Sequence, residues 1–369
     1  MSDRGSRRRA ALRKSFKADK IDALLVSVET NVRYLTGFTG DSSALVVTRD
    51  RELIVSDGRY EEQLRQECPG LEAHIRPMQQ PMAKALGAIL AKLGSGRVGF
   101  ESSGVTVAEF ESIRGQAGSV DLVGLSGRVE ALRAVKDKDE IDAIRRAVTI
   151  AERAFAMLRA GLRPEDSEKK TADALESYLR HCGAVAASFP PIVAAGARAA
   201  LPHARPEPDA RLDAAEFVLI DWGASIGPHP YKSDLTRVLA HGKVGSKFET
   251  VYRTVLEAQR RAIAAVRPGA KTENVDAEAR SVIEEAGFGR FFGHGLGHGI
   301  GLDIHEAPRL RPGAESGEVL WPGMVVTIEP GIYLPGWGGI RIEDDVLVTS
   351  DGQEVLSNVP KDLDSVAPW

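Results

Sequence analysis

Short hydrophobic runs alternate with longer amphipathic stretches along the first third of the chain. The short runs are bounded by polar residues, which is typical of buried strands, and they predict strands at 23–28, 43–48, 52–55 and 98–101. The amphipathic stretches predict helices at 60–67 and 82–93. Strands and helices in alternation indicate an α/β domain with a mixed sheet.

The pattern changes near residue 130. The charged segment 129–140 leads into a stretch whose apolar residues recur at steps of three and four, one stripe of a helix: Ile141, Ile144, Val148, Ala151, Phe155 and Leu158. Further helices are expected at 167–181 and 247–266, and strands at 217–220, 235–239, 324–328 and 340–348. Helices followed by antiparallel-looking strands predict an α+β domain. We therefore expect two domains, 1–130 and 131–369.

Composition narrows the functional classes. The 369 residues are 43% hydrophobic and 27% charged, which excludes a disordered or collagen-like chain. With 48 basic and 52 acidic residues the net charge is -4, so there is no global electrostatic reason to bind nucleic acid or an anionic membrane. No apolar stretch reaches the ~20 residues of a membrane span, and we expect no membrane partner.

Two features suggest the compartment. The chain starts with a basic segment containing Arg7, Arg8 and Arg9, which we interpret as a solvated tail or frayed helix and not as a targeting signal, because no long apolar run follows it. Cys68 and Cys182 are far apart and fit a reducing compartment better than a disulfide framework. These features predict a cytoplasmic protein.

Three separated segments concentrate the residues that carry chemistry. In the first, Asp221 closes the apolar run 217–220, and Asp234 lies where a returning strand would begin. A carboxylate that closes an apolar run is costly to bury unless a cation compensates its charge.

The second segment is rich in glycine and histidine. Glycine occupies every odd position from 293 to 301, which is too much glycine for a stable helix and favours a tight strand or loop. His294 and His298 project from this segment and His305 follows it. Three of the chain's eight histidines lie within 12 residues, which favours a functional role.

The third segment again places a carboxylate after an apolar run. Glu329 follows 325–328, and further along Arg341 and Glu343 are two residues apart. On a strand, Arg341 and Glu343 would share one face while Ile340 and Ile342 take the other. Glu343 should therefore point away from the packed isoleucines.

Together the segments supply four carboxylates and one imidazole: Asp221, Asp234, His298, Glu329 and Glu343. Two divalent cations would cancel the four negative charges. An oxygen-rich set with one nitrogen and no thiolate favours Mn²⁺, with Co²⁺, Fe²⁺ and Zn²⁺ also compatible. A pair of such ions supports metal-assisted hydrolysis. Spacing alone does not establish that the three segments meet.

At these residues the chain resembles the pita-bread metallopeptidases, which include methionine aminopeptidase, aminopeptidase P and prolidase. The first part, with Asn31-Val32-Arg33-Tyr34-Leu35-Thr36-Gly37-Phe38, resembles the creatinase-type N-domain. The resemblance implies a pita-bread catalytic domain, a curved antiparallel sheet with outer helices, after a smaller α/β N-domain with a mixed sheet. That N-domain argues against methionine aminopeptidase, which lacks it.

The resemblance also implies roles for the residues named above. Asp221 binds one metal ion, and Asp234 and Glu343 bridge both ions. His298 and Glu329 hold the other ion, and Glu329 carries the proton of the attacking water. Residues outside the metal set also match: the substrate-facing histidines His203, His294 and His305, Arg341 near the bridging glutamate, and Arg309 at the position of an arginine proposed to hold the dipeptide carboxylate in archaeal prolidases. A plain surface arginine is the alternative for Arg309.

One departure from the relatives lies between the two aspartates. Relatives usually place them 11 residues apart, whereas Asp221 and Asp234 are 13 apart, with the extra pair near 227–230. Two added residues preserve the alternation of side chains along a strand. We expect the metal site to survive this insertion and the mouth of the site to change shape.

The leading functional hypothesis is an Xaa-Pro aminopeptidase that removes the residue before proline, acts on short peptides with proline in second position and is a homodimer. The alternative is an Xaa-Pro dipeptidase (prolidase). A non-catalytic binding protein or a metal-free amidinohydrolase is less favoured, because all five metal-ligand positions are intact.

Overall fold

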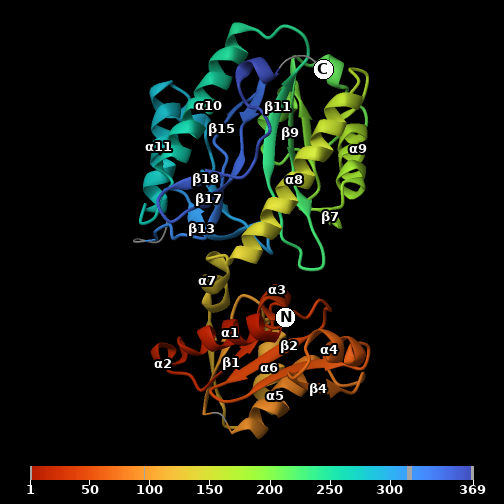
Figure 1. Cartoon of the computed structure of the whole chain (residues 1–369), viewed down its shortest axis with the longest axis vertical. Helices are drawn as coiled ribbons and strands as arrows, with labels where there is room; N and C mark the ends of the chain where they lie inside the picture. Colours follow the sequence, from red (N-terminus) through yellow and green to blue (C-terminus); the bar gives the residue numbers. More distant parts are fainter. Residues whose placement is uncertain (1, 95, 314–317, 367–369) are drawn as a thin grey trace. The chain divides into compact units, whose positions relative to one another are not determined.

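The computed structural model describes residues 2–94, 96–313 and 318–366. The chain divides into two compact units, Met1–Arg133 and Ala134–Trp369, each of which is described here by itself (Figure 1). Within the described residues, no helix combines the length and apolar character that crossing a bilayer requires.

The first unit is built on a six-stranded sheet with the order β4-β3-β2-β1-β5-β6. Its strands are β1 (Ala23–Val26), β2 (Ala44–Thr48), β3 (Glu52–Asp57), β4 (Glu72–Arg76), β5 (Arg97–Glu101) and β6 (Asp121–Leu125). Strand β2 is antiparallel to both β1 and β3, whereas the pairs β3/β4, β1/β5 and β5/β6 are parallel. The predicted mixed sheet is therefore confirmed.

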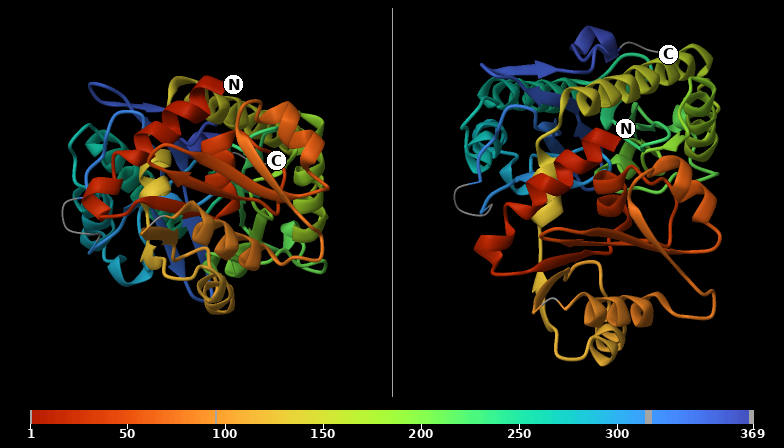
Figure 2. Two further views of the ribbon diagram at one scale, coloured as in Figure 1. Left: turned by 90° about the horizontal axis from the view of Figure 1, so that it is seen from below. Right: turned by 60° about the horizontal axis from the view of Figure 1, so that its bottom comes forward.

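The helices described up to residue 134 are α1 (Ser2–Arg13), α2 (Phe16–Asp19), α3 (Glu29–Thr36), α4 (Glu61–Glu67), α5 (Met82–Leu93), α6 (Val107–Gln116) and α7 (Arg128–Ala134). Ala23 and Leu25 pack in one cluster with Leu86 of α5 and Ile113 of α6, while the alternate residue Leu24 is buried on the opposite face. Helices α5 and α6 lie on one face of the sheet and α1 and α3 on the other (Figure 2).

The basic start of the chain is not a solvated tail. It forms α1, and Arg9 is only 8% exposed. Arg9 Nε lies 2.5 Å from Glu52 Oε2 of β3, and Arg9 Nη1 donates to the carbonyl of Leu35 at 2.7 Å. Arg13 also pairs with Glu52, at 2.7 Å. The expectation of a solvated charge run was wrong because a carboxylate on the sheet anchors the helix, a long-range contact that local composition does not encode.

The second unit contains four α-helices among its described residues: α8 (Lys138–Gly161), α9 (Glu168–His181), α10 (Ser246–Ala265) and α11 (Thr272–Glu285). Helix α8 starts at a capping box of Asp137 and Glu140, and its predicted apolar stripe is buried from Ile144 to Leu158, while Ile141 is only partly buried. Helix α11 was not predicted, although Val275, Ala279 and Val282 mark one face at helical spacing. Four short 3₁₀ helices are also described, η1 (Gly196–Ala200), η2 (Leu212–Ala214), η3 (Gly289–Phe291) and η4 (Leu363–Val366).

The strands of this unit are β7 (Ala186–Ala187), β8 (Ile192–Ala195), β9 (Phe217–Trp222), β10 (Ala224–Ser225), β11 (Leu235–Ala240), β12 (Gly297–Gly299), β13 (Glu306–Leu310), β14 (Val325–Ile328), β15 (Gly331–Leu334), β16 (Gly338–Arg341), β17 (Asp344–Val348) and β18 (Gln353–Val355). They form small antiparallel sheets, of which β11-β9-β8 and β13-β12-β14-β17-β18 are the largest described. A single bridge between Thr236 and Glu343 connects the two.

The helices divide between two groups of strands. Helix α9 packs against β7 and β8, and α8 against β10, while α10 contacts β14, β15 and β16, and α11 contacts β13 (Figure 1). Trp222 of β9 stacks on Phe155 of α8 with ring centroids 4.2 Å apart, and its indole N–H donates to the carbonyl of Ala151. The packed helices thereby fix the strand ends that carry Asp221 and Asp234.

The segment 340–348 forms two strands and not the single strand that was predicted. Strand β16 ends at Arg341 and pairs with β15, whereas β17 begins at Asp344 and pairs with β14. Between them the N–H of Glu343 donates to the carbonyl of Thr236 at 3.2 Å. Although the chain changes its pairing partner at Glu343, Arg341 and Glu343 still contact the same hydroxyl, that of Thr236, while Ile340 and Ile342 pack in the hydrophobic core, as the sequence predicted.

Candidate active site

Ten residues singled out from the sequence line one cavity of about 1060 Å³ in the second unit. They come from separate segments, and the structure brings all of them to this cavity: His203, Asp221, Asp234, His294, His298, His305, Arg309, Glu329, Arg341 and Glu343. The three segments that carry the carboxylates and histidines therefore meet.

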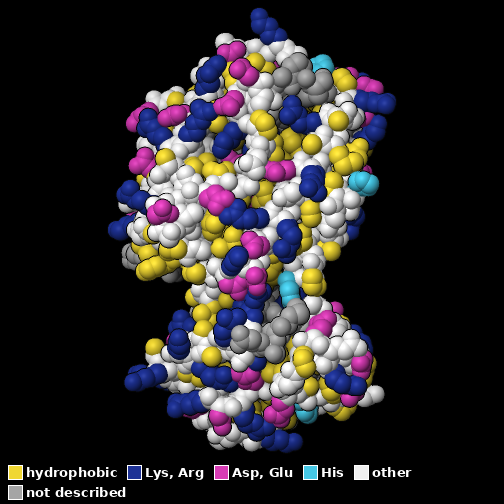
Figure 3. Space-filling view, in the orientation of Figure 1, with side chains coloured by type: hydrophobic (Ala, Val, Ile, Leu, Met, Phe, Trp, Pro, Cys, Tyr) yellow, Lys and Arg dark blue, Asp and Glu magenta, His cyan; other side chains and the backbone are white. Residues whose placement is uncertain are grey.

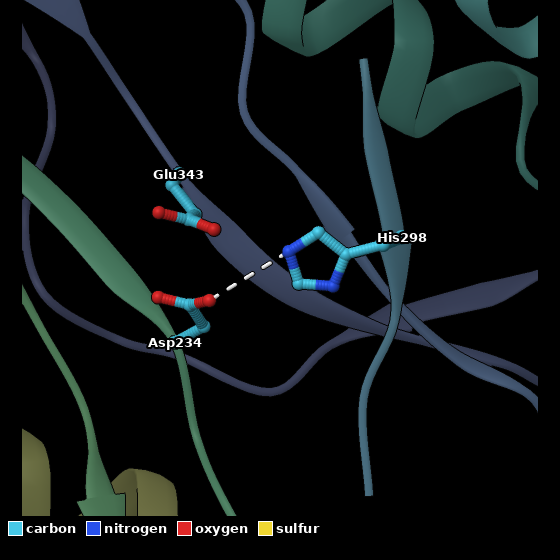
Figure 4. A group of neighbouring side chains, drawn as sticks. All are labelled: Asp234, His298 and Glu343. Atoms are coloured by element: carbon cyan, nitrogen blue, oxygen red, sulfur yellow. Dashed lines mark ion pairs between the residues drawn. The ribbon is translucent and has the colours of Figure 1, made fainter. Parts of the chain in front are cut away.

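Asp234, His298 and Glu343 form a compact group at the bottom of this arrangement. Each offers a ligand atom, these atoms lie within 4.8 Å of one another, and all three residues are buried. The side chains point toward one another, His298 from β12, Asp234 from just before β11 and Glu343 from just before β17, with Asp234 Oδ2 3.8 Å from His298 Nε2 (Figure 4). The group could hold a metal ion.

Glu329 adjoins this group on the side of His298. Its Oε1 lies 3.3 Å from His298 Nε2. The hydroxyl of Thr327 donates to Glu329 Oε1 at 3.1 Å and accepts the backbone N–H of His298, also at 3.1 Å. The hydroxyl of Thr327 thus fixes the carboxylate of Glu329 relative to the backbone of β12.

Asp221 is connected to the group through Arg341. Arg341 Nη2 donates to Asp221 Oδ2 at 2.5 Å, and Arg341 Nε donates to the hydroxyl of Thr236 at 3.1 Å. That hydroxyl in turn donates to Glu343 Oε2 at 2.6 Å. Asp221 Oδ1 is buried and has no hydrogen-bond partner among the described residues. A buried carboxylate oxygen without a donor is well suited to a cation.

Three polar residues at the site escaped sequence reasoning, although a simple rule could have found them. Thr236, Thr327 and Asp345 each lie two positions from an acidic site residue, Asp234, Glu329 and Glu343 respectively. Asp345 Oδ2 accepts the backbone N–H of Asp234 at 3.0 Å. Because side chains at i and i+2 share a strand face, polar residues at that spacing are candidates for supporting the acids.

Burial and mutual repulsion set the protonation of the acids. Burial, together with the nearby carboxylates Glu343 and Asp221, raises the pKa of Asp234 well above its usual range. Burial, with Glu329 and Asp221 nearby, does the same to the pKa of Glu343. Each carboxylate therefore favours a proton or a bound cation as a partner. The charge, the oxygen-rich donors and the partnerless Asp221 Oδ1 fit divalent cations.

The histidines around the acids differ in their environment. Burial lowers the pKa of His294, whose Nε2 lies 2.9 Å from the hydroxyl of Tyr333. The ring of His305 meets that of His298 edge-on at 4.4 Å, and desolvation together with His298 and Arg309 lowers the pKa of His305 to about 4. His203 is exposed at the mouth.

Tyr333 is a further cavity residue that the sequence analysis did not identify. It lies four residues after Glu329, is 7% exposed and lines the cavity. Arg341 Nη1 donates to this hydroxyl at 2.8 Å. The sequence did contain a signal for this residue: a tyrosine, whose side chain is apolar with a polar end, follows closely after the predicted site residue Glu329.

The two-residue insertion forms a loop that leaves both aspartates at the cavity. Strands β9 and β11 stay in register up to the pair of Trp222 and Leu235. Beyond it, the N–H of Ser233 donates to the carbonyl of Ala224, and the hydroxyl of Tyr231 donates to Glu140 Oε1 at 2.5 Å. The added residues therefore lie in the loop between β10 and β11.

Comparison with known proteins gives two matches along the chain. Residues 142–350 match metallopeptidase family M24, and residues 8–135 match the creatinase/prolidase N-terminal domain. The chain is 37% identical to the uncharacterized peptidase YqhT of Bacillus subtilis, over 95% of this chain and 98% of that protein. It is 32% identical to a Xaa-Pro dipeptidase of Pyrococcus horikoshii, over 94% of this chain and 95% of that protein.

Solved structures agree with these matches. A Xaa-Pro dipeptidase from Bacillus anthracis superposes with a TM-score of 0.92 at 37% identity, covering 97% of this chain and 99% of that one. An X-Pro aminopeptidase from Thermotoga maritima superposes with a TM-score of 0.84 at 34% identity, covering 95% of this chain and 99% of that one.

Proposed function

This chain belongs to metallopeptidase family M24 and carries a creatinase/prolidase N-terminal domain, and we propose that it hydrolyses the peptide bond of Xaa-Pro dipeptides. Family membership confirms the resemblance and the fold class that the sequence predicted, a creatinase-type domain followed by a pita-bread catalytic domain. It also makes the protein a peptidase and hence a hydrolase.

The dipeptidase has more support than the Xaa-Pro aminopeptidase, which the sequence analysis placed first. The Pyrococcus horikoshii relative and the Bacillus anthracis structure are both Xaa-Pro dipeptidases. The Thermotoga maritima structure is an X-Pro aminopeptidase that superposes less closely than the Bacillus anthracis dipeptidase, with a TM-score of 0.84 against 0.92, although its 34% identity exceeds the 32% of the Pyrococcus horikoshii relative. Xaa-Pro aminopeptidase activity is therefore the second candidate.

The observation that carries the proposal is the position of Arg309. In the antiparallel pair of β12 and β13, Arg309 lies directly opposite His298. Side chains directly opposite each other share a face of the sheet, and the side chain of Arg309 lines the same cavity as His298. The free carboxylate of an Xaa-Pro dipeptide belongs to the proline, just after the scissile bond, and a guanidinium group on the cavity wall suits it.

We assign two divalent ions to the site, with Mn²⁺ the preferred metal. Asp221 would bind one ion, His298 and Glu329 the other, and Asp234 and Glu343 would be shared. Bound ions would neutralise the carboxylates and supply electrophilic assistance to hydrolysis of the peptide carbonyl. Arg341, which already contacts Asp221, would orient that carboxylate toward its ion.

Side chains of the protein would carry out the proton transfers and contact the substrate during hydrolysis. In hydrolysis a C–O bond forms from water to the scissile carbonyl carbon and the C–N bond to proline breaks. Glu329 would take a proton from the attacking water and pass it to the proline nitrogen. His294 and His305, which also line the cavity, would contact the substrate carbonyl as charge develops on it. His203 would contact the bound peptide at the mouth.

A substrate panel tests this assignment. Protein stripped with a chelator and resupplied with Mn²⁺ should hydrolyse Met-Pro and Ala-Pro, and should cleave Ala-Pro-Ala far more slowly. Replacement of Arg309 by glutamine should raise KM for the dipeptides. It should also reduce the difference between the rates at which the dipeptides and the tripeptide are cleaved. Faster cleavage of the tripeptide by the unchanged protein would identify it as an aminopeptidase.

We also propose that the protein is a homodimer and is cytoplasmic. The dimer follows from the resemblance described above, and the location is supported by the two free thiols of Cys68 and Cys182. Light scattering coupled to size-exclusion chromatography gives the mass in solution. A monomeric mass at micromolar concentration would contradict the dimer.

A further inference from the structure

The mouth of the cavity carries an excess of arginine. Apart from the buried acids and Arg341, the charged side chains that line it in the described part of the chain are all arginines: Arg205, Arg290, Arg309 and Arg311. They come from three separate segments, the loop after η1, the helix η3, and the end of β13 with the residue that follows it. All four are exposed.

These arginines differ from most others in the same unit, which are paired with acids. Arg198 contacts Glu168 at 2.9 Å and Glu207 at 2.6 Å, and Arg280 contacts Asp276 at 2.8 Å. By contrast, none of the four arginines at the mouth forms an ion pair with a described carboxylate. The guanidinium of Arg290 lies over the ring of Phe291, 4.5 Å from its centroid.

The excess is local to the cavity. On the face shown in Figure 3, basic and acidic side chains are interspersed over both units, and the chain as a whole has a net charge of -4. A concave site whose mouth carries one sign of charge concentrates the electrostatic potential there and attracts ligands of the opposite sign. With divalent ions neutralising the acids at the bottom, the mouth would retain its positive charge.

One dipeptide carboxylate does not account for four guanidinium groups. Arg309 is assigned to the carboxylate of proline, which leaves Arg205, Arg290 and Arg311. Guanidinium groups prefer carboxylates, which they bind through paired hydrogen bonds. In an Xaa-Pro dipeptide a second carboxylate can lie only on the side chain of the first residue. Building on the proposed function, we propose that this enzyme prefers dipeptides whose first residue is acidic, Glu-Pro and Asp-Pro.

The test compares substrates that differ only in charge. Glu-Pro and Gln-Pro have nearly the same shape, so the ratio of their kcat/KM values isolates the carboxylate. We expect a ratio of about 5 to 10 in favour of Glu-Pro at low salt, decreasing as salt screens the arginines, and slow cleavage of Lys-Pro. A ratio of one or below would overturn the proposal.

Variants connect the preference to the arginines. In the double variant Arg205→Gln/Arg290→Gln, the Glu-Pro to Gln-Pro ratio should fall at least threefold. Arg253→Gln removes an exposed arginine from α10, outside the cavity, and should leave the ratio unchanged. A ratio that responds equally to both changes, or to neither, would contradict the assignment.

The outcomes separate this inference from the proposed function. Hydrolysis of Gln-Pro and Met-Pro without a preference for Glu-Pro would leave the dipeptidase standing and overturn only the acidic preference. Failure to hydrolyse any Xaa-Pro dipeptide would overturn both. Arginine-dependent cleavage of Ala-Pro-Ala without a Glu-Pro preference would show that the second carboxylate is the C-terminus of a longer peptide, again against this inference.

Discussion

The hydroxyl of Tyr333 lies 2.9 Å from Nε2 of His294. The same hydroxyl accepts a hydrogen bond from Arg341 at 2.8 Å, and Arg341 in turn holds Asp221. One phenol therefore joins a histidine assigned to the substrate with the arginine that orients an acidic residue of the proposed metal site.

Replacement of Tyr333 by phenylalanine should slow catalysis without removing metal. The change deletes one oxygen and leaves His294 and Arg341 without this partner in a buried wall, which we expect to lower kcat/KM by about 10- to 100-fold. Kinetics and elemental analysis of bound metal check this outcome. Tyr252→Phe is the matched control, because its hydroxyl contacts the carbonyl of Lys361 away from the cavity. Equal losses in both variants would indicate a general effect on folding.

Asp234→Asn and Glu343→Gln should abolish both metal binding and turnover. Each removes a negative charge at a position assigned to both ions while keeping the shape of the side chain, so we expect activity to fall by at least about 1000-fold. Arg341→Ala should be milder, because its effect on the ions passes through Asp221. Near-normal turnover of Glu343→Gln with Mn²⁺ supplied would disprove the two-ion assignment.

His203 and His298 should separate substrate binding from metal binding. His298 is buried beside Asp234 and Glu329, so His298→Ala should lose bound metal. His203 is exposed at the mouth, so His203→Ala should keep the metal and lose most of its turnover. Metal content measured after gel filtration distinguishes the two. If both variants lost metal equally, this division of roles would be untenable.

The buried pair of Lys136 and Glu306 should matter for stability. Lys136 Nζ lies 3.4 Å from Glu306 Oε2, with side chains only 1% and 5% exposed. Lys136→Met would remove the cation beside the buried carboxylate of Glu306 and should lower the free energy of unfolding by about 3 to 5 kcal/mol. Lys169→Met breaks an exposed pair with Asp173 and should cost less than about 1 kcal/mol. Urea unfolding of both variants measures the difference, and similar midpoints would refute the prediction.

The two cysteines should react at different rates with alkylating reagents. Burial raises the pKa of the Cys68 thiol to about 11, so little thiolate exists near neutral pH. Cys182 is only partly buried. At about pH 8 we expect Cys182 to be modified first, and Cys68 to react only after unfolding or as the pH approaches its pKa. Peptide mass spectrometry resolves the two sites, and rapid labelling of native Cys68 would contradict its burial.

Much of this protein could be predicted from local sequence pattern. Helix α5 starts and ends where its apolar spacing predicts, and strand β14 ends immediately before Glu329. The spacing of apolar residues is a local property, because side chains repeat every two residues in a strand and every 3.6 residues in a helix. The acids that end apolar runs could be recognised for the same reason, because a buried charge requires compensation wherever the chain goes.

Only the tertiary structure decided which residues meet. The contact of Arg341 with Asp221 spans 120 positions, and that of Arg9 with Glu52 spans 43. The change of pairing partner between β16 and β17 depends on the hydrogen bond of Glu343 to Thr236. The arginines of the mouth come from segments about 100 positions apart. Such pairings depend on strand register and helix packing across distant segments, whereas the periodicity of a sequence reports only which face of its own element a residue occupies.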